Sequence, residues 1–160
     1  MQNPASECRF LTGQRMGHEM ALLVVDDNED DRIFLEHVLT RSGLRIAIEF
    51  VRDGAEALEY LTRRAISGLR LPDVVLLDFH LRKFNGVEVA RRIKAHLELA
   101  SIKIVIWSGA MISEAWEAAY EQGASLLLWK HANLSLLEKD VNTLYAMGGE
   151  GDFVEGGLGI

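Results

Sequence analysis

Two adjacent carboxylates, Asp26 and Asp27, follow the apolar run ALLVV, and a third, Asp78, follows the run VVLL. In a parallel sheet buried on both faces, strands read as continuous Val/Ile/Leu runs, and ligands bind outside their carboxyl ends. Two carboxylates about 4 Å apart repel by roughly 4 kcal/mol at an effective dielectric near 20, so three together need a cation. Oxygen ligands with no Cys or paired His nearby favour Mg²⁺ or Mn²⁺. The pattern predicts a divalent metal site.

Two further apolar runs end on groups that bind phosphate. IKIVIW is followed by Ser108, and LLLW is followed by Lys130. The lysine adds a compact positive charge and the serine hydroxyl adds a hydrogen bond. With a metal-bound carboxylate, these groups suit phosphoryl transfer, whose catalysis is mostly positioning and charge stabilisation. The sequence therefore indicates phosphoryl transfer in which Asp78 is the nucleophile and forms an acyl phosphate.

The elements that must position these residues alternate along the chain. Each of five expected strands precedes a segment of helical periodicity. The strands are predicted at residues 21–25, 46–51, 74–77, 102–107 and 126–129. Strands that alternate with helices imply a parallel sheet with right-handed crossovers and helices on both faces. We predict an α/β fold with a doubly wound, five-stranded parallel sheet in the order 2-1-3-4-5.

Polar residues mark the expected helix starts. Asn28 to Asp31 supply a cap and an acidic first turn, Asp53 and Glu56 have capping-box spacing, and another helix opens near Asn85. Apolar residues at helical spacing should face the core. They are Ile33, Phe34, Val38 and Leu39; Val87, Ala90, Ile93 and Leu97; Ile112, Ala115, Trp116, Ala119 and Tyr120; and Leu134, Leu137, Val141, Leu144 and Tyr145.

Composition limits the class of protein. The 160 residues suit one domain, with a flexible N-terminal extension at 1–19, a folded domain at 20–147 and a Gly-rich tail at 148–160. A net charge of −7 without a long Lys/Arg cluster argues against direct nucleic-acid binding. The single Cys8 excludes an internal disulfide. No apolar stretch approaches the roughly 18 residues of a membrane span, so we predict a cytoplasmic protein without membrane insertion.

The ordered set of site residues resembles the receiver domain of two-component response regulators over nearly all of residues 20–147. The gaps also agree, with 30 residues from Asp78 to Ser108 and 22 from Ser108 to Lys130. The resemblance implies a flavodoxin-like receiver fold. It also implies that Asp78 accepts a phosphoryl group from the phosphohistidine of a histidine kinase, and that Ser108 and Lys130 bind this group.

The resemblance further implies a metal ligand set and a role in signalling. Asp27, Asp78 and the main-chain carbonyl of His80 would hold Mg²⁺, with Mn²⁺ able to substitute and Asp26 acting through metal-bound water. The domain would catalyse its own phosphotransfer and dephosphorylation without turning over a separate substrate. It would act as a stand-alone switch or phosphorelay intermediate between a histidine kinase or phosphotransfer protein and a downstream protein. Residues 62–72 resemble stand-alone receivers that partner phytochrome-type kinases.

Several positions depart from the family pattern. His131 follows Lys130 where the family usually has Pro. A non-proline cis bond costs about 3 to 4 kcal/mol, so the loop is expected to be either trans and rearranged or strained. Arg82 likewise replaces a Pro, and Asn85 replaces an Asp. Leu127 occupies the aromatic switch position, which argues against the familiar inward swing of a ring.

Two residues bear on the lifetime of the phosphoryl group. His80, two positions after Asp78, could lean over the phosphoryl group and affect the attacking water. The corresponding position after Ser108 is Ala110, which offers no acid or amide to orient water.

Two other functions compete with a phosphorylated switch. A pseudo-receiver, a binding module independent of phosphate, is suggested by Leu127, His131 and Arg82. An enzyme of the haloacid dehalogenase type also uses an Asp nucleophile and Mg²⁺, but that family needs Asp two residues later, where this chain has His80.

Aromatic residues near the last two helices suggest an interface. Exposed Trp116, Tyr120, Trp129 or Tyr145 would form a partner surface, and a homodimer through some face is an open expectation. Strand alternation is expected to send Trp107 and Trp129 to surfaces away from the site.

Overall fold

The computed structural model describes residues 19–110 and 113–149. The predicted N-terminal extension and C-terminal tail lie outside this part of the chain except for Glu19, Gly148 and Gly149, and Ile112 also lies outside it. Within the described residues, no helix combines the length and apolar character needed to cross a membrane.

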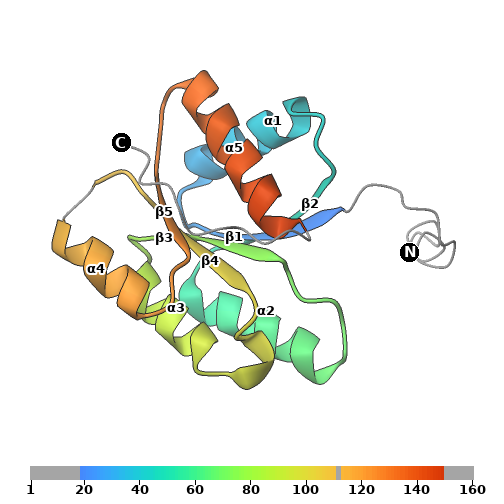
Figure 1. Cartoon of the computed structure of the whole chain (residues 1–160), viewed down its shortest axis with the longest axis vertical. Coiled ribbons are helices and arrows are strands. Elements are labelled where there is room, and N and C mark those ends of the chain that lie inside the picture. Colours follow the sequence, from blue (N-terminus) through green and yellow to red (C-terminus); the bar gives the residue numbers. More distant parts are fainter. Residues whose placement is uncertain (1–18, 111–112, 150–160) are drawn as a thin grey trace, which may run out of the picture.

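Five parallel strands form one sheet in the order β2-β1-β3-β4-β5, which confirms the predicted topology. The strands are β1 (Met20–Val25), β2 (Ile46–Val51), β3 (Val74–Asp78), β4 (Lys103–Ser108) and β5 (Leu126–Trp129). The helices are α1 (Glu29–Arg41), α2 (Gly54–Ile66), α3 (Gly86–Lys94), α4 (Ser113–Glu121) and α5 (Leu134–Gly148), with a short 3₁₀ helix, η2 (Leu97–Leu99). Helices α1 and α5 cover one face, and α2, α3 and α4 cover the other (Figure 1).

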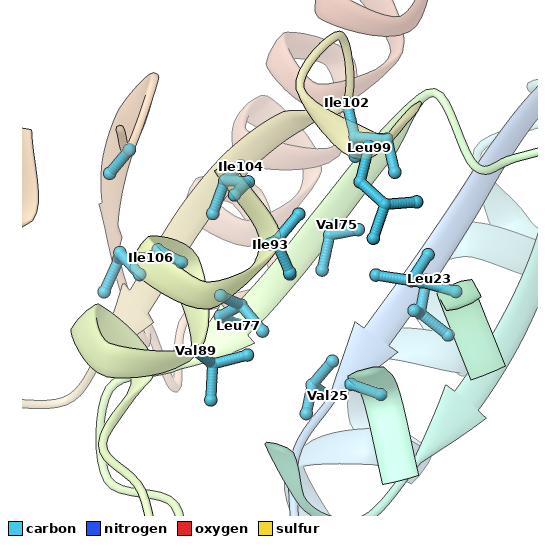
Figure 2. Packing of buried hydrophobic residues seen from close by; sticks show 14 of the residues in the cluster. Leu23, Val25, Val75, Leu77, Val89, Ile93, Leu99, Ile102, Ile104 and Ile106 are labelled. Carbon is cyan, nitrogen blue, oxygen red and sulfur yellow. The ribbon is translucent and has the colours of Figure 1, made fainter. Parts of the chain in front are cut away.

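The alternation of side chains along the central strands builds a core on each face of the sheet. Leu23 and Val25 pack toward α2 and α3, whereas Leu22 and Val24 pack toward α1 and α5. Figure 2 shows the core on the α2 and α3 side, where Ile93 of α3 lies over the sheet. Because β1, β3 and β4 are covered on both faces, they read as continuous apolar runs. Each fully buried Leu, Ile or Val contributes roughly 1.5–3 kcal/mol of hydrophobic stabilisation.

The helices that follow β1, β2 and β3 begin at the predicted caps. The side-chain oxygen of Asn28 accepts from the Asp31 amide at 3.1 Å. Asp53 accepts from the Glu56 amide at 2.8 Å, and Asn85 accepts from the Glu88 amide at 2.9 Å. Each contact satisfies one amide that the first helical turn leaves unpaired. These caps fix where each helix starts relative to the end of the preceding strand.

Three predicted core residues are instead exposed. Ile33 is 58% exposed because the core face of α1 is formed by Leu35, Val38 and Leu39. Leu97 is 92% exposed, since α3 ends at Lys94 and the helical period does not continue into η2. Tyr120 is 48% exposed, so only part of the predicted α4 stripe faces the core. The face that each helix turns to the sheet and the residue at which it ends decided these three positions, and local periodicity does not encode either of them.

Candidate metal centre

The carboxyl ends of the central strands bring the predicted site residues to one edge of the sheet. In the strand register, Val25 pairs with Leu77, Asp78 with Trp107, and Ser108 with Trp129. Asp26 directly follows β1, and its amide donates to the Val51 carbonyl at 3.1 Å. The Lys130 amide donates to the Ser108 carbonyl at 2.8 Å. The ends of β1, β3, β4 and β5 therefore converge as the sequence predicted.

Three carboxylates form the centre of this edge. Asp26, Asp27 and Asp78 each offer an oxygen, and these oxygens lie within 4.8 Å of one another. Asp26 is fully buried and Asp78 is 5% exposed, whereas Asp27 opens to solvent. Mg²⁺ binds carboxylate oxygens at 2.0–2.1 Å and keeps several waters, so a cluster of this span with one open side fits a hydrated divalent cation. The donor set contains oxygen ligands only.

Lys130 supplies the positive charge at the centre. Its ammonium lies 2.8 Å from Asp26 Oδ2, 2.7 Å from Asp31 Oδ2 and 3.1 Å from Asp78 Oδ2. The Lys130 side chain is only 16% exposed. A buried ammonium needs such partners, because removing an ion from water costs several kcal/mol unless it is paired.

The buried acid and the lysine perturb each other's protonation. Burial raises the pKa of Asp26 to about 6, although the hydrogen bond from Lys130, the Asn28 amide and the charge of Lys130 all act to lower it. Burial alone would lower the pKa of Lys130, but Asp26, Asp31 and Asp78 together raise it above its ordinary value. Lys130 is therefore charged at neutral pH, and Asp26 carries its charge only above about pH 6 without a metal.

Ser108 ends β4 and is 6% exposed. Its hydroxyl donates to the Ala110 carbonyl at 2.7 Å and accepts from the Ala110 amide at 3.3 Å. The hydroxyl group is thus engaged with its own loop, and it has to rotate to donate to a ligand on Asp78.

The loop between β3 and α3 is held tightly against Asp78. The His80 amide donates to Asp78 Oδ1 at 3.0 Å, and the Gly86 amide donates to the Phe79 carbonyl at 2.9 Å. A Cβ atom added to Gly86 would lie 2.6 Å from the Asp78 carbonyl oxygen, so only glycine permits this close approach. The start of α3 is therefore pinned to the end of β3.

Arg82 and Asn85, the two residues of this loop that depart from the receiver pattern, make specific contacts. The Arg82 guanidinium lies 3.4 Å from Asp27 Oδ2, although its side chain is 86% exposed. Asn85 caps α3. Between them, Lys83 has a φ of 69°, a left-handed conformation that favours glycine.

Two residues of the site were not recognised from the sequence. Asp31 was interpreted as part of an acidic helix start, yet it makes the shortest of the three Lys130 contacts. Trp107 was expected to point away from the site, but Lys130 Nζ lies 4.9 Å from the centre of its ring. Its indole N–H also donates to the Trp129 carbonyl at 3.1 Å. The sequence signal for Asp31 was its place in the helical turn that directly follows the Asp26–Asp27 pair.

The sequence left open whether the loop after β5, which contains Lys130 and His131, is trans and rearranged or strained. The described part of the chain contains no cis peptide bond, so the Lys130–His131 bond is trans. His131 Nε2 lies 3.7 Å from Asp140 Oδ2 on α5. Leu127 is partly buried and packs against the core on the α2 and α3 side. No ring therefore occupies the switch position on β5.

Residues 22–142 match the family model of the response regulator receiver domain. The chain belongs to this family. As a receiver domain it is part of a two-component signalling system, in which such domains act with kinases or phosphotransfer proteins and with downstream targets.

Two curated relatives cover most of the receiver domain. One is FilR2 of Methanothrix harundinacea, a probable methanogenesis regulatory protein, with 31% identity over 123 residues covering 77% of this chain and 79% of the relative. The other is the response regulator Rcp1 of Synechocystis, with 30% identity over 121 residues covering 75% and 82%.

Solved structures agree with the fold. The phosphorylated cyanobacterial phytochrome response regulator RcpA superposes with a TM-score of 0.71 at 29% identity, covering 82% of this chain and 94% of that one. The Mn²⁺-bound form of Rcp1 gives 0.69 at 28% identity, covering 79% and 92%. The predicted flavodoxin-like receiver fold is confirmed. These similarities fit phosphorylation-dependent signalling and do not favour the phosphate-independent alternative.

Proposed function

We propose that Asp78 accepts a phosphoryl group from the phosphohistidine of a histidine kinase or phosphotransfer protein. In this step the P–N bond of a phosphohistidine protonated on its second ring nitrogen breaks and a bond from phosphorus to a carboxylate oxygen of Asp78 forms, so the donor is left as a neutral imidazole. The observation that carries the proposal is the convergence of three carboxylates and a buried lysine at the strand ends of a receiver domain. Asp78 is the carboxylate that also terminates a central strand, which fixes its position.

Mg²⁺ is the proposed cofactor, and Mn²⁺ is expected to substitute. Asp27 and Asp78 would hold the ion together with the main-chain carbonyl of His80, and Asp26 would contact it through water. Bound there, the metal supplies charge stabilisation on the phosphoryl oxygens. The carboxylate cluster of 4.8 Å span and the Mn²⁺-bound form of Rcp1 support a divalent ion at this place.

Lys130 and Ser108 would bind the phosphoryl oxygens. Lys130 already lies 3.1 Å from Asp78 Oδ2, so a phosphoryl group on that carboxylate is within reach of its ammonium. The Ser108 hydroxyl would exchange its bond to the Ala110 carbonyl for one to the phosphoryl group. His80 is exposed beside Asp78 and Ala110 offers only main-chain groups, so we expect His80 rather than Ala110 to tune hydrolysis.

The test is phosphorylation in the presence of Mg²⁺. Acetyl phosphate or a phosphorylated kinase should add one phosphoryl group to the wild-type chain, measured by mass spectrometry of the intact protein. Asp78→Asn should abolish labelling, and the control Asp53→Asn, in a helix cap outside the site, should retain it. Absence of labelling by every donor in a folded protein would refute the proposal. Turnover of small phosphate esters would instead favour the dehalogenase-type enzyme.

We also propose how the phosphorylated domain signals. Residues 20–147 would act as the receiver, flanked by the segments 1–19 and 148–160, in the cytoplasm and through protein contacts rather than direct nucleic-acid binding. Tyr120 and Trp129 are 48% and 39% exposed, and they offer aromatic surface for a downstream protein or a second copy of the chain. With Leu127 at the switch position, the change is expected to pass through the Ser108 and Lys130 loops.

A further inference from the structure

Lys130 is shared among three carboxylates, and one of them lies outside the set expected for a receiver domain. Asp31, from the first turn of α1, is as close to the ammonium as Asp26 is, at 2.7 Å against 2.8 Å. The Asp31 side chain is 33% exposed and the Lys130 side chain 16%, so this contact is partly shielded from solvent. Such a pair is screened less by salt than a surface ion pair.

The hydrogen-bonding capacity of Lys130 is already used in this arrangement. An ammonium has three N–H donors and no acceptor. Hydrogen bonds to Asp26 and Asp31 take two donors, and Asp78 at 3.1 Å faces the third. A phosphoryl group on Asp78 brings three acceptor oxygens, so Lys130 can serve it fully only by loosening another contact. Asp26 is buried and bound to the Asn28 amide, which leaves Asp31 as the more mobile competitor.

The negative charge of Asp31, like its hydrogen bond to Lys130, acts against phosphorylation of Asp78. Asp31 and Asp78 both lie within 3.1 Å of one nitrogen atom, so charge added at Asp78 acts on Asp31 at short range. Phosphorylation of Asp78 makes the local charge more negative, from −1 to about −1.5 to −2. A nearby carboxylate therefore opposes the phosphorylated state.

We propose that Asp31 is a positioning residue that holds Lys130 in the unphosphorylated state and competes with the phosphoryl group for it. This inference rests on the proposed function of Asp78. It makes α1 a part of the switch, because the contact to Asp31 weakens when Lys130 turns toward the phosphoryl group.

Beryllofluoride with Mg²⁺ is the probe, since it binds a carboxylate as a stand-in for the phosphoryl group. Asp31→Asn keeps an oxygen acceptor and removes the charge, so it should tighten beryllofluoride binding by roughly 3- to 10-fold. The matched control is Asp30→Asn, an exposed neighbour on the same helical turn, which should change the affinity by less than about twofold because solvent screens its charge.

Trp107 provides the readout, since its ring lies 4.9 Å from Lys130 Nζ. A background with Trp116→Phe and Trp129→Phe leaves Trp107 as the single tryptophan of the chain. If the wild type binds beryllofluoride but Asp31→Asn binds it equally or more weakly, the competition is wrong while the proposed function stands. If the wild type binds none and Asp78 is not labelled, the proposed function fails.

A second measurement tests the Asp31 contact without metal or anion. The thermal midpoints of Asp31→Asn, Lys130→Gln and the double variant form a mutant cycle. The thermal midpoint of the double variant should fall by less than the sum of the falls in the two single variants, because each single change already breaks the same contact. Additive losses would show that Asp31 does not hold Lys130 and would overturn the inference whatever the anion does.

Discussion

Asp26 is a carboxyl group that folding moves from water into a fully buried position. Its pKa in the folded protein, about 6, lies above the value near 3.8 expected for an exposed Asp. The folded state therefore holds this proton between about pH 4 and pH 6, where the unfolded state has released it. The stabilising contribution is complete below about pH 4 and is lost as the pH rises through 6.

We expect the metal-free protein to lose up to about 3 kcal/mol of unfolding free energy from this group between pH 4 and 7. Urea unfolding in EDTA at several pH values measures it. The difference between the wild type and Asp26→Asn should shift in favour of the variant across this window. Parallel pH profiles for the two proteins would contradict the assignment.

Arg82 places a second positive charge at the metal centre, 3.4 Å from Asp27. An ion pair whose arginine side chain is 86% exposed is worth at most about 1 kcal/mol and is screened by salt. A divalent ion bound to Asp27 has to displace or repel this guanidinium. Arg82→Ala should therefore tighten Mg²⁺ or Mn²⁺ binding by up to roughly fivefold at low salt, with a smaller gain at high salt.

Calorimetric titration of the metal measures the effect of Arg82→Ala. Lys83→Ala is the matched control, because it removes an adjacent exposed charge and leaves the Arg82–Asp27 contact in place. Equal affinities for the two variants would attribute any gain to overall charge rather than to this contact.

The loop from β3 to α3 contains the Asn85 cap, the close approach of Gly86 to Asp78 and a strained residue, Lys83. Lys83 adopts a φ of 69°, where a Cβ atom meets the following carbonyl oxygen at a cost of roughly 1–2 kcal/mol. Glycine has no such cost but loses more backbone entropy on folding. We expect Lys83→Gly to raise the unfolding free energy by roughly 0.5–1 kcal/mol.

The midpoint of urea unfolding measures this gain. Lys83→Ala removes the same charge and retains the Cβ atom, so it should show no such gain. If the alanine variant is stabilised as much as the glycine variant, the effect comes from the side chain and not from the backbone conformation.

At the scale of the whole molecule, a metal that binds only the folded sheet edge must stabilise the fold. The carboxylates of Asp26, Asp27 and Asp78 come together only when β1 and β3 pair, so the unfolded chain offers no comparable site. Free Mg²⁺ at 100 times its dissociation constant should add about 2.7 kcal/mol of stability.

Thermal unfolding with Mg²⁺ and with EDTA tests this linkage. The midpoint should rise with Mg²⁺ in the wild type and in Asp30→Asn, and the rise should be largely lost in Asp27→Asn. An equal rise in Asp27→Asn would place the metal elsewhere on the molecule.

The sequence alone determined the sheet order and the polar residues that follow the strands, but not the contacts of Asp31 and Trp107 with Lys130. Buried parallel strands leave uninterrupted apolar runs, so both the strands and the polar residues that end them can be identified locally. Parallel topology then forces those ends to one edge, which is why Asp26, Asp78, Ser108 and Lys130 meet as predicted. The helix caps were equally local, since each depends on a side chain and an amide three residues later.

The tertiary structure decided which groups Lys130 touches. Asp31 and Lys130 are separated by 99 residues, and their contact depends on how α1 and the end of β5 pack on the sheet. The position of Trp107 beneath the lysine and the pairing of Arg82 with Asp27 are likewise set by distances across elements. Local periodicity encodes a face and a strand end, but it contains no information about which distant side chain will lie within hydrogen-bonding distance.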